Sequence, residues 1–133
     1  MKRFLLTVIA CLLCLTAANA QTKTNGADIF TPISKYIRLG DCDKLSVWFA
    51  DNLELDILGA VNNCSRNQAK LIMRNFFDTF NPKSFDIIHE SGTVPMKYAV
   101  GKLDAGGDKF RIIISVKADG TKSYIQELKI ERE

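Results

Sequence analysis

Histidine is nearly missing from this sequence, since His89 is the only one among 133 residues, and cysteine is scarce with four. Protein zinc sites need several histidine or cysteine ligands at short spacing. Beyond residue 20, neither C-x-x-C nor H-E-x-x-H occurs. We therefore predict no metal site and no cofactor, and we assign no catalytic residues.

Long apolar runs are also missing, apart from one between Phe4 and Leu15. That run is too short for a membrane-spanning helix, which needs about 20 residues. It follows two basic residues and precedes the small-residue triplet that ends at Ala20, as in a secretory signal peptide. We expect residues 1–20 to be removed and the protein to be periplasmic or secreted. A lipoprotein cut before Cys11 is the alternative, which would leave the protein anchored by lipid.

Charge of one sign does not dominate the remaining chain. Lys2 and Arg3 account for two of the 18 basic residues, so the rest nearly balances the 15 acidic residues. A nucleic-acid partner is therefore not expected. Residues 21–26 look like a short flexible lead-in, and residues 27–133 are long enough for a single domain with one core.

The first part of this domain shows helical periodicity. Apolar residues at helical spacing predict a helix that ends at Gly40: Ile29, Phe30, Ile33, Tyr36 and Ile37. Asp41 can cap a second, shorter helix, for which the apolar residues are Leu45, Val47, Trp48 and Phe49. The alternating stretch "LELDIL" then predicts a strand.

A longer helix begins at Ser65, because Ser65 and Gln68 form the pattern of a capping box. One face of this helix is apolar: Ala69, Ile72, Met73, Phe76, Phe77 and Phe80. Asn81 and Pro82 should end it. Such a wide apolar face must pack against a large apolar surface.

The C-terminal half changes to the period of a strand. Four strands are predicted in "SFDIIHE", "PMKYAVGKL", "KFRIIISVK" and "SYIQELKIE", joined by turns in "SGTV", "DAGGD" and "ADGT". Consecutive strands should pair as an antiparallel meander. Because apolar residues alternate with polar ones around Phe110 and Ile112, one side of the sheet should be dry and covered by the helices. A phosphate-binding loop in "DAGGD" is disfavoured, since no helix follows it.

Two cysteines remain after the signal peptide, Cys42 and Cys64. In an oxidising compartment they can form one disulfide. The alternative is a pair of unbonded buried thiols. Cys64 is a poor candidate nucleophile, because the only histidine that could serve as its base belongs to a different element.

The segments "ADIFTPISKYIRLGD", "WFADNLELDILG", "SRNQAKLIMRNFF", "SFDIIHE", "KYAVGKL" and "IQELKIE" resemble a family of small secreted Bacteroidetes proteins called domain of unknown function 4783. The order of elements is similar to the nuclear-transport-factor-2-like (NTF2-like), or cystatin-like, superfamily. The resemblance implies an α+β cone, in which a mainly antiparallel curved sheet wraps around the long helix. In many superfamily members the opening of the cone holds a small ligand or an active site. The family itself has no activity to carry over.

Strand alternation gives the candidate residues inside the cone. It places His89 with Phe85 and Ile87, Tyr98 with Met96 and Val100, and Gln126 with Tyr124 and Leu128. Trp48 is a further candidate, either as a wall for ligand stacking or as a core residue. His89 can be the anchor of a polar site or a structural histidine.

Two functions remain open. The first is a noncatalytic module that binds a small molecule or an envelope protein through the cone. The second is a cryptic isomerase-, dehydratase- or hydrolase-like enzyme that transfers protons through His89. A homodimer through the face of the sheet is a further expectation.

Overall fold

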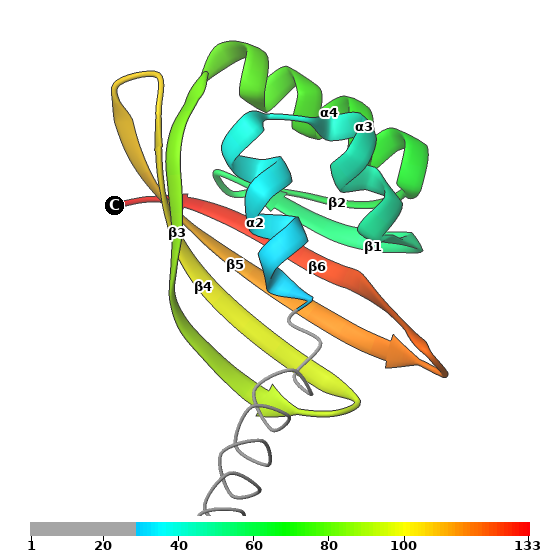
Figure 1. Ribbon diagram of the computed structural model, residues 1–133. Coiled ribbons are helices and arrows are strands. Elements are labelled where there is room, and N and C mark those ends of the chain that lie inside the picture. The colour runs from blue at the N-terminus through cyan, green and yellow to red at the C-terminus, as the bar shows by residue number, and fades with distance from the viewer. Residues whose placement is uncertain (1–28) are drawn as a thin grey trace, which may run out of the picture.

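The fold consists of a curved sheet of six strands with helices packed on its concave side (Figure 1). The computed structural model describes residues 29–133. The predicted signal peptide, lead-in and first domain residues therefore lie outside the described residues. The strand order is β2-β1-β6-β5-β4-β3. The predicted α+β cone is confirmed, with a sheet that is mixed, because β1 and β6 run parallel.

The N-terminal helices follow the predicted pattern at first and then depart from it. Helix α2 spans Phe30–Leu39 and ends at Gly40, whose φ of 65° is a left-handed conformation that glycine adopts without strain. Asp41 caps α3 (Cys42–Leu45) by accepting a hydrogen bond from the amide of Lys44 (3.1 Å). The second helix is shorter than predicted, because the chain continues as a 3-10 turn, η1 (Ser46–Trp48), and enters strand β1 at Phe49.

A hairpin that the sequence analysis missed follows. Strand β1 (Phe49–Ile57) pairs with β2 (Ala60–Ser65), and its turn consists of Leu58 and Gly59, both at positive φ. The amide of Gly59 donates to Asp56 Oδ1 (3.0 Å) and holds the turn. Strand β2 escaped detection because "AVNNC" has no alternation of apolar and polar residues.

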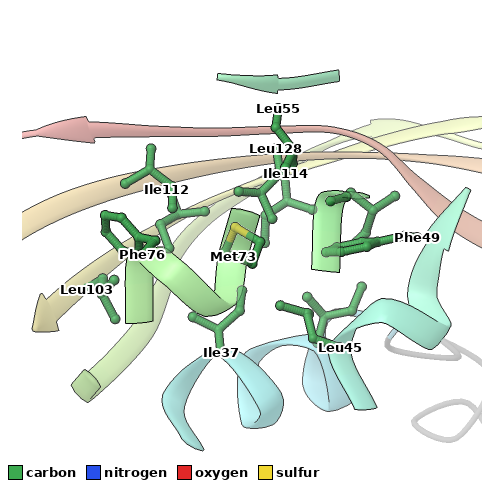
Figure 2. Packing of buried hydrophobic residues seen from close by; sticks show 14 of the residues in the cluster. Ile37, Leu45, Phe49, Leu55, Met73, Phe76, Leu103, Ile112, Ile114 and Leu128 are labelled. Carbon is green, nitrogen blue, oxygen red and sulfur yellow. The ribbon is translucent and has the colours of Figure 1, made fainter. Parts of the chain in front are cut away.

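Helix α4 (Arg66–Thr79) begins at the predicted capping box. The amide of Gln68 donates to Ser65 Oγ (3.3 Å), and the amide of Ser65 donates to Gln68 Oε1 (3.2 Å). The helix buries the centre of its predicted apolar face, namely Ala69, Met73, Phe76 and Phe77. Figure 2 shows Met73 and Phe76 between the sheet and the other helices.

The four-strand meander is also confirmed. It consists of β3 (Pro82–Thr93), β4 (Met96–Ala105), β5 (Asp108–Asp119) and β6 (Lys122–Arg132). The first turn consists of Val94 and Pro95, whose peptide bond is cis, so it begins at the last residue of the predicted segment "SGTV" and extends one residue beyond it. None of the helices described between residues 29 and 133 is long and apolar enough to cross a membrane.

Candidate functional site

The sheet extends past the helices, and a cavity of about 780 Å³ lies at this uncovered end. In Figure 1 the hairpin tips of β3–β4 and β5–β6 extend beyond the start of α2. We call this cavity the cone-mouth pocket and define it by its lining residues: Ile29, Pro32, Val47, Trp48, Val94, Pro95, Lys97, Val116, Ala118, Gly120, Thr121, Lys122, Ser123 and Tyr124. The pocket is thus built by the first turn of α2, by η1 and by two hairpins.

The walls of the cone-mouth pocket are mainly apolar. Trp48 is half-buried, while Val47 and Val94 expose 66% and 69% of their surface at the rim. Single exposed apolar side chains are ordinary on a protein surface, so these two valines matter here only because they extend the apolar lining of the pocket. The exposure of these two valines follows from their positions, because Val47 lies in η1 and Val94 lies in the turn at the tip of the β3–β4 hairpin.

The charged residues of the pocket have a single sign. Lys97 and Lys122 line it, and no aspartate, glutamate or histidine is among the described lining residues. The hydroxyl-bearing residues Thr121, Ser123 and Tyr124 add polar groups along β6 and its turn. The pocket therefore combines a mainly apolar interior with two cations, and its described lining residues include no carboxylate or imidazole.

Of the four residues predicted to line the cone, the structure places only Trp48 in the cone-mouth pocket. The predicted inward position of His89 is wrong. Ile87 pairs with Gly101 and His89 with Val100, so Ile88 is an extra residue in β3. This bulge reverses the alternation of the strand, and His89 lies exposed on the outer face of the sheet.

The inward position of Gln126 is wrong for the same reason. Val116 pairs with Ile125 and Ser115 with Glu127, which leaves Gln126 as the extra residue of a bulge in β6. Gln126 is exposed and lines a separate polar recess of about 520 Å³. The charges of Arg66 and Asp51 in this recess already pair with each other (3.1 Å).

Tyr98 was also predicted to point into the cone, and this prediction is wrong although β4 has no bulge at Tyr98. The inner side of β4 carries the buried residues Ala99, Gly101 and Leu103, whereas Tyr98 is 39% exposed on the outer side. Glycine is required at position 101 because the ring of Phe85 on β3 lies over it on the inner side. The inner side of β4 therefore follows Ala99, Gly101 and Leu103 and not Tyr98.

The predicted disulfide is also wrong, because Cys42 and Cys64 are both unbonded and buried. Arg74 and Asp78 of α4 act on the Cys42 thiol, while Cys64 precedes the opposite end of that helix. Arg74 lies nine positions after Ser65, which corresponds to a rise of about 13 Å along an α-helix. The Cα atoms of a disulfide must lie within about 7 Å of each other.

Both thiols are expected to be unreactive at neutral pH. Burial raises the pKa of the Cys42 thiol to about 11, although Arg74 nearby opposes the shift, and burial also raises the pKa of Cys64. The thiolate is the reactive form, so neither residue is a nucleophile at neutral pH. No cluster of three or more metal-binding side chains occurs within residues 29–133.

We expect the Cys42 thiol to make the protein less stable in alkali. Its pKa is near 9 when exposed and about 11 when folded, so the unfolded chain loses this proton first and the free energy of unfolding falls between these pH values. Denaturant titrations across this window should show a smaller fall for Cys42→Ala. An equal fall in both proteins would contradict the prediction. Native protein at neutral pH should also resist iodoacetamide until it is unfolded.

The residues that sequence reasoning missed are Val94, Pro95, Lys97 and Lys122. The one signal for them was the apolar Val94 beside Pro95 at a position expected to be a polar turn. The lysines gave no signal, because a lysine near a hairpin turn is ordinary on a solvated surface.

Comparison with known proteins identifies the family and supports the fold described above. Residues 30–131 match the family model described as "Domain of unknown function (DUF4783)". The comparison with curated proteins finds no match. The matched region covers all the described helices and the whole sheet except the last residue of β6.

Solved structures show the same fold. A DUF4783 family protein from Bacteroides ovatus has 20% identity and a TM-score of 0.77, with 81% of this chain and 98% of that chain covered. A DUF4783 family protein from Bacteroides uniformis has 18% identity and a TM-score of 0.76, covering 80% and 98%. An NTF2-like protein of unknown function from Silicibacter pomeroyi has 13% identity and a TM-score of 0.62, covering 86% and 98%.

Proposed function

Because the chain belongs to the DUF4783 family and has an NTF2-like fold, we propose that it is a noncatalytic module that binds a small amphipathic molecule in the cone-mouth pocket. The ligand has an apolar body and an anionic group. We further propose that binding takes place in the periplasm or outside the cell, as the signal-peptide pattern of residues 1–20 indicates.

The apolar lining of the pocket is the observation that carries this proposal. A volume of about 780 Å³ falls within the range of small-molecule sites, which is roughly 300 to 1,000 Å³. The rings of Trp48 and Tyr124 offer flat apolar surface, and Val116 and Ala118 form part of the sheet side. Transfer of an alkyl chain or a fused-ring body from water to such a surface is favourable.

The two lysines support an anionic group on the ligand. Lys97 comes from β4 and Lys122 from the start of β6, so the two cations come from the two hairpins that bound the pocket. Since no acidic residue is among the described lining residues, a carboxylate or sulfate would meet attraction only. A cationic ligand would meet repulsion.

The enzymatic alternative loses its main support. It depends on His89 inside the cone, and His89 is exposed on the outer face. A proton transfer needs a base within hydrogen-bond reach of its substrate, and the described lining residues include no carboxylate or imidazole. Binding without catalysis therefore fits the chemistry of the pocket better.

Trp48 provides the test, because it is the only tryptophan in the chain. Titration with dodecanoate should change its fluorescence in a saturable way, and dodecanol should bind more weakly. Replacing both lysines (Lys97→Gln with Lys122→Gln) should weaken dodecanoate binding roughly tenfold, because two exposed ion pairs contribute about 1 to 2 kcal/mol together.

Two variants serve as controls. Lys83→Gln removes an exposed lysine at the opposite end of β3, and His89→Ala changes the outer face, so both should bind dodecanoate like the unmodified protein. If dodecyltrimethylammonium binds as tightly as dodecanoate, the ligand is not selected for negative charge. If no amphiphile changes Trp48 fluorescence, the proposed use of the pocket is wrong.

A further inference from the structure

The two edge strands of the sheet, β3 and β2, differ in how well they are protected from pairing with another chain. The edge strand β3 carries charged residues, has a bulge at Ile88 and packs against α2. Arg38 of α2 donates a hydrogen bond to the carbonyl of Phe85 on this edge (3.3 Å). Charges, bulges and covering helices are the devices that prevent edge strands from pairing with other chains.

The other edge strand, β2, has neither a charge nor a bulge, and α4 contacts it at the end where the helix begins. Its sequence "AVNNCS" contains no charge and no proline, and its pairing with β1 is regular. Residues 60–63 are all exposed, and Val61 exposes 56% of its surface. An exposed edge without charge, proline or bulge is able to accept a further strand.

The register of the hairpin shows which backbone groups β2 presents. Ile57 and Ala60 flank the two-residue turn, so Ala60, Asn62 and Cys64 direct their amides and carbonyls toward β1. Val61, Asn63 and Ser65 direct theirs outward. The amide of Ser65 indeed binds Gln68 Oε1 (3.2 Å), outside the β1–β2 ladder. The amides and carbonyls of Val61 and Asn63 are left to face the open edge.

We propose that β2 pairs in antiparallel fashion with β2 of a second copy, about a twofold axis at Asn62, and so joins two sheets into one. This register places Val61 opposite Asn63 of the second copy, and the outward groups of both strands then satisfy one another. Antiparallel pairing of a strand with itself is isologous, so a single edge suffices. No like charges meet, because β2 has none.

The resulting dimer should be weak and dependent on concentration. A six-residue strand pair buries far less than the roughly 1,600 Å² of a standard stable interface. The affinity comes mainly from backbone hydrogen bonds. This dimer also differs from one formed through the outer face of the sheet, because it leaves Tyr98 and His89 exposed.

A cysteine pair tests the register. Asn62 faces Asn62 of the second copy as a non-hydrogen-bonded pair, whose Cα atoms lie about 4.5 Å apart, within disulfide reach. Mild oxidation of the Asn62→Cys protein should therefore yield a covalent dimer. The matched control Asn63→Cys should not, since Asn63 faces Val61. Cys42 and Cys64 are buried and should not contribute. Equal cross-linking of both variants would overturn the proposed register.

A charge substitution tests the dimer itself. Asn62→Lys places two like charges opposite each other, so sedimentation at high concentration should show the monomer mass, whereas Asn62→Ser should retain the dimer. Position 62 is exposed on a regular strand, so the Asn62→Lys and Asn62→Ser variants should melt at the same temperature. A dimer that persists in Asn62→Lys, or an unmodified protein that stays monomeric at every concentration, would overturn the proposal.

Discussion

Phe110→Ala should lower the free energy of unfolding by about 3 to 5 kcal/mol, the largest single loss that we expect in this protein. Phe110 is fully buried in the middle of an aromatic cluster. Its ring centroid lies 5.3 Å from that of Phe76 and 4.9 Å from that of Phe80, both in edge-to-face geometry. Removing the ring therefore creates a cavity between the sheet and α4 and ends two aromatic contacts at once.

Thermal and denaturant unfolding should measure this loss. A domain of about 100 residues shifts its melting temperature by roughly 4 to 8 °C per kcal/mol, so the melting temperature should fall by at least ~12 °C. Tyr98→Ala is the matched control, because it removes an aromatic ring from the exposed outer face and should cost far less. Equal losses for the two variants would contradict the position of Phe110 in the core.

Gly101→Ala should also destabilise the protein, by about 1 to 3 kcal/mol or somewhat more. A Cβ atom added at Gly101 would overlap the Cζ and Cε1 atoms of the Phe85 ring. Phe85 is fully buried and cannot swing into solvent, so β3 and β4 would have to move apart. The measurement is again the free energy of unfolding.

A double variant identifies the clash as the cause. Phe85→Leu opens space above Gly101, so Gly101→Ala should be less harmful in the Phe85→Leu background than in the unmodified protein. Strictly additive effects of the two substitutions would mean that Gly101 matters for some other reason, such as its own backbone.

Helix α4 and the meander could be predicted from the sequence because local signals agreed with the tertiary structure. The capping box at Ser65 defined the start of α4, and the alternation around Phe110 and Ile112 defined the dry face of β5. These signals depend on neighbours in sequence, which a single chain displays directly. Strand β2 lacked such a signal and was missed.

The candidate site was harder to predict because strand faces were inferred by counting. One extra residue in a strand moves every later side chain to the other face, as the bulge at Ile88 did to His89, and Gln126 is itself the extra residue of the bulge in β6. At Tyr98 the error came from size, since Phe85 requires the small residue Gly101 on the inner side. The cone-mouth pocket depends on where α2 and two hairpins end in space, which no local pattern reports.

The position of β6 has a consequence for how the chain acquires its fold. β6 is the last strand in the sequence, yet it lies between β1 and β5 in the sheet. Until residues 122–132 have left the ribosome, β1 and β5 each expose an unpaired edge, and the core cannot close. Pairing the first strand with the last also gives a high contact order, which slows folding. We therefore expect the sheet to close only after residues 122–132 have been synthesised.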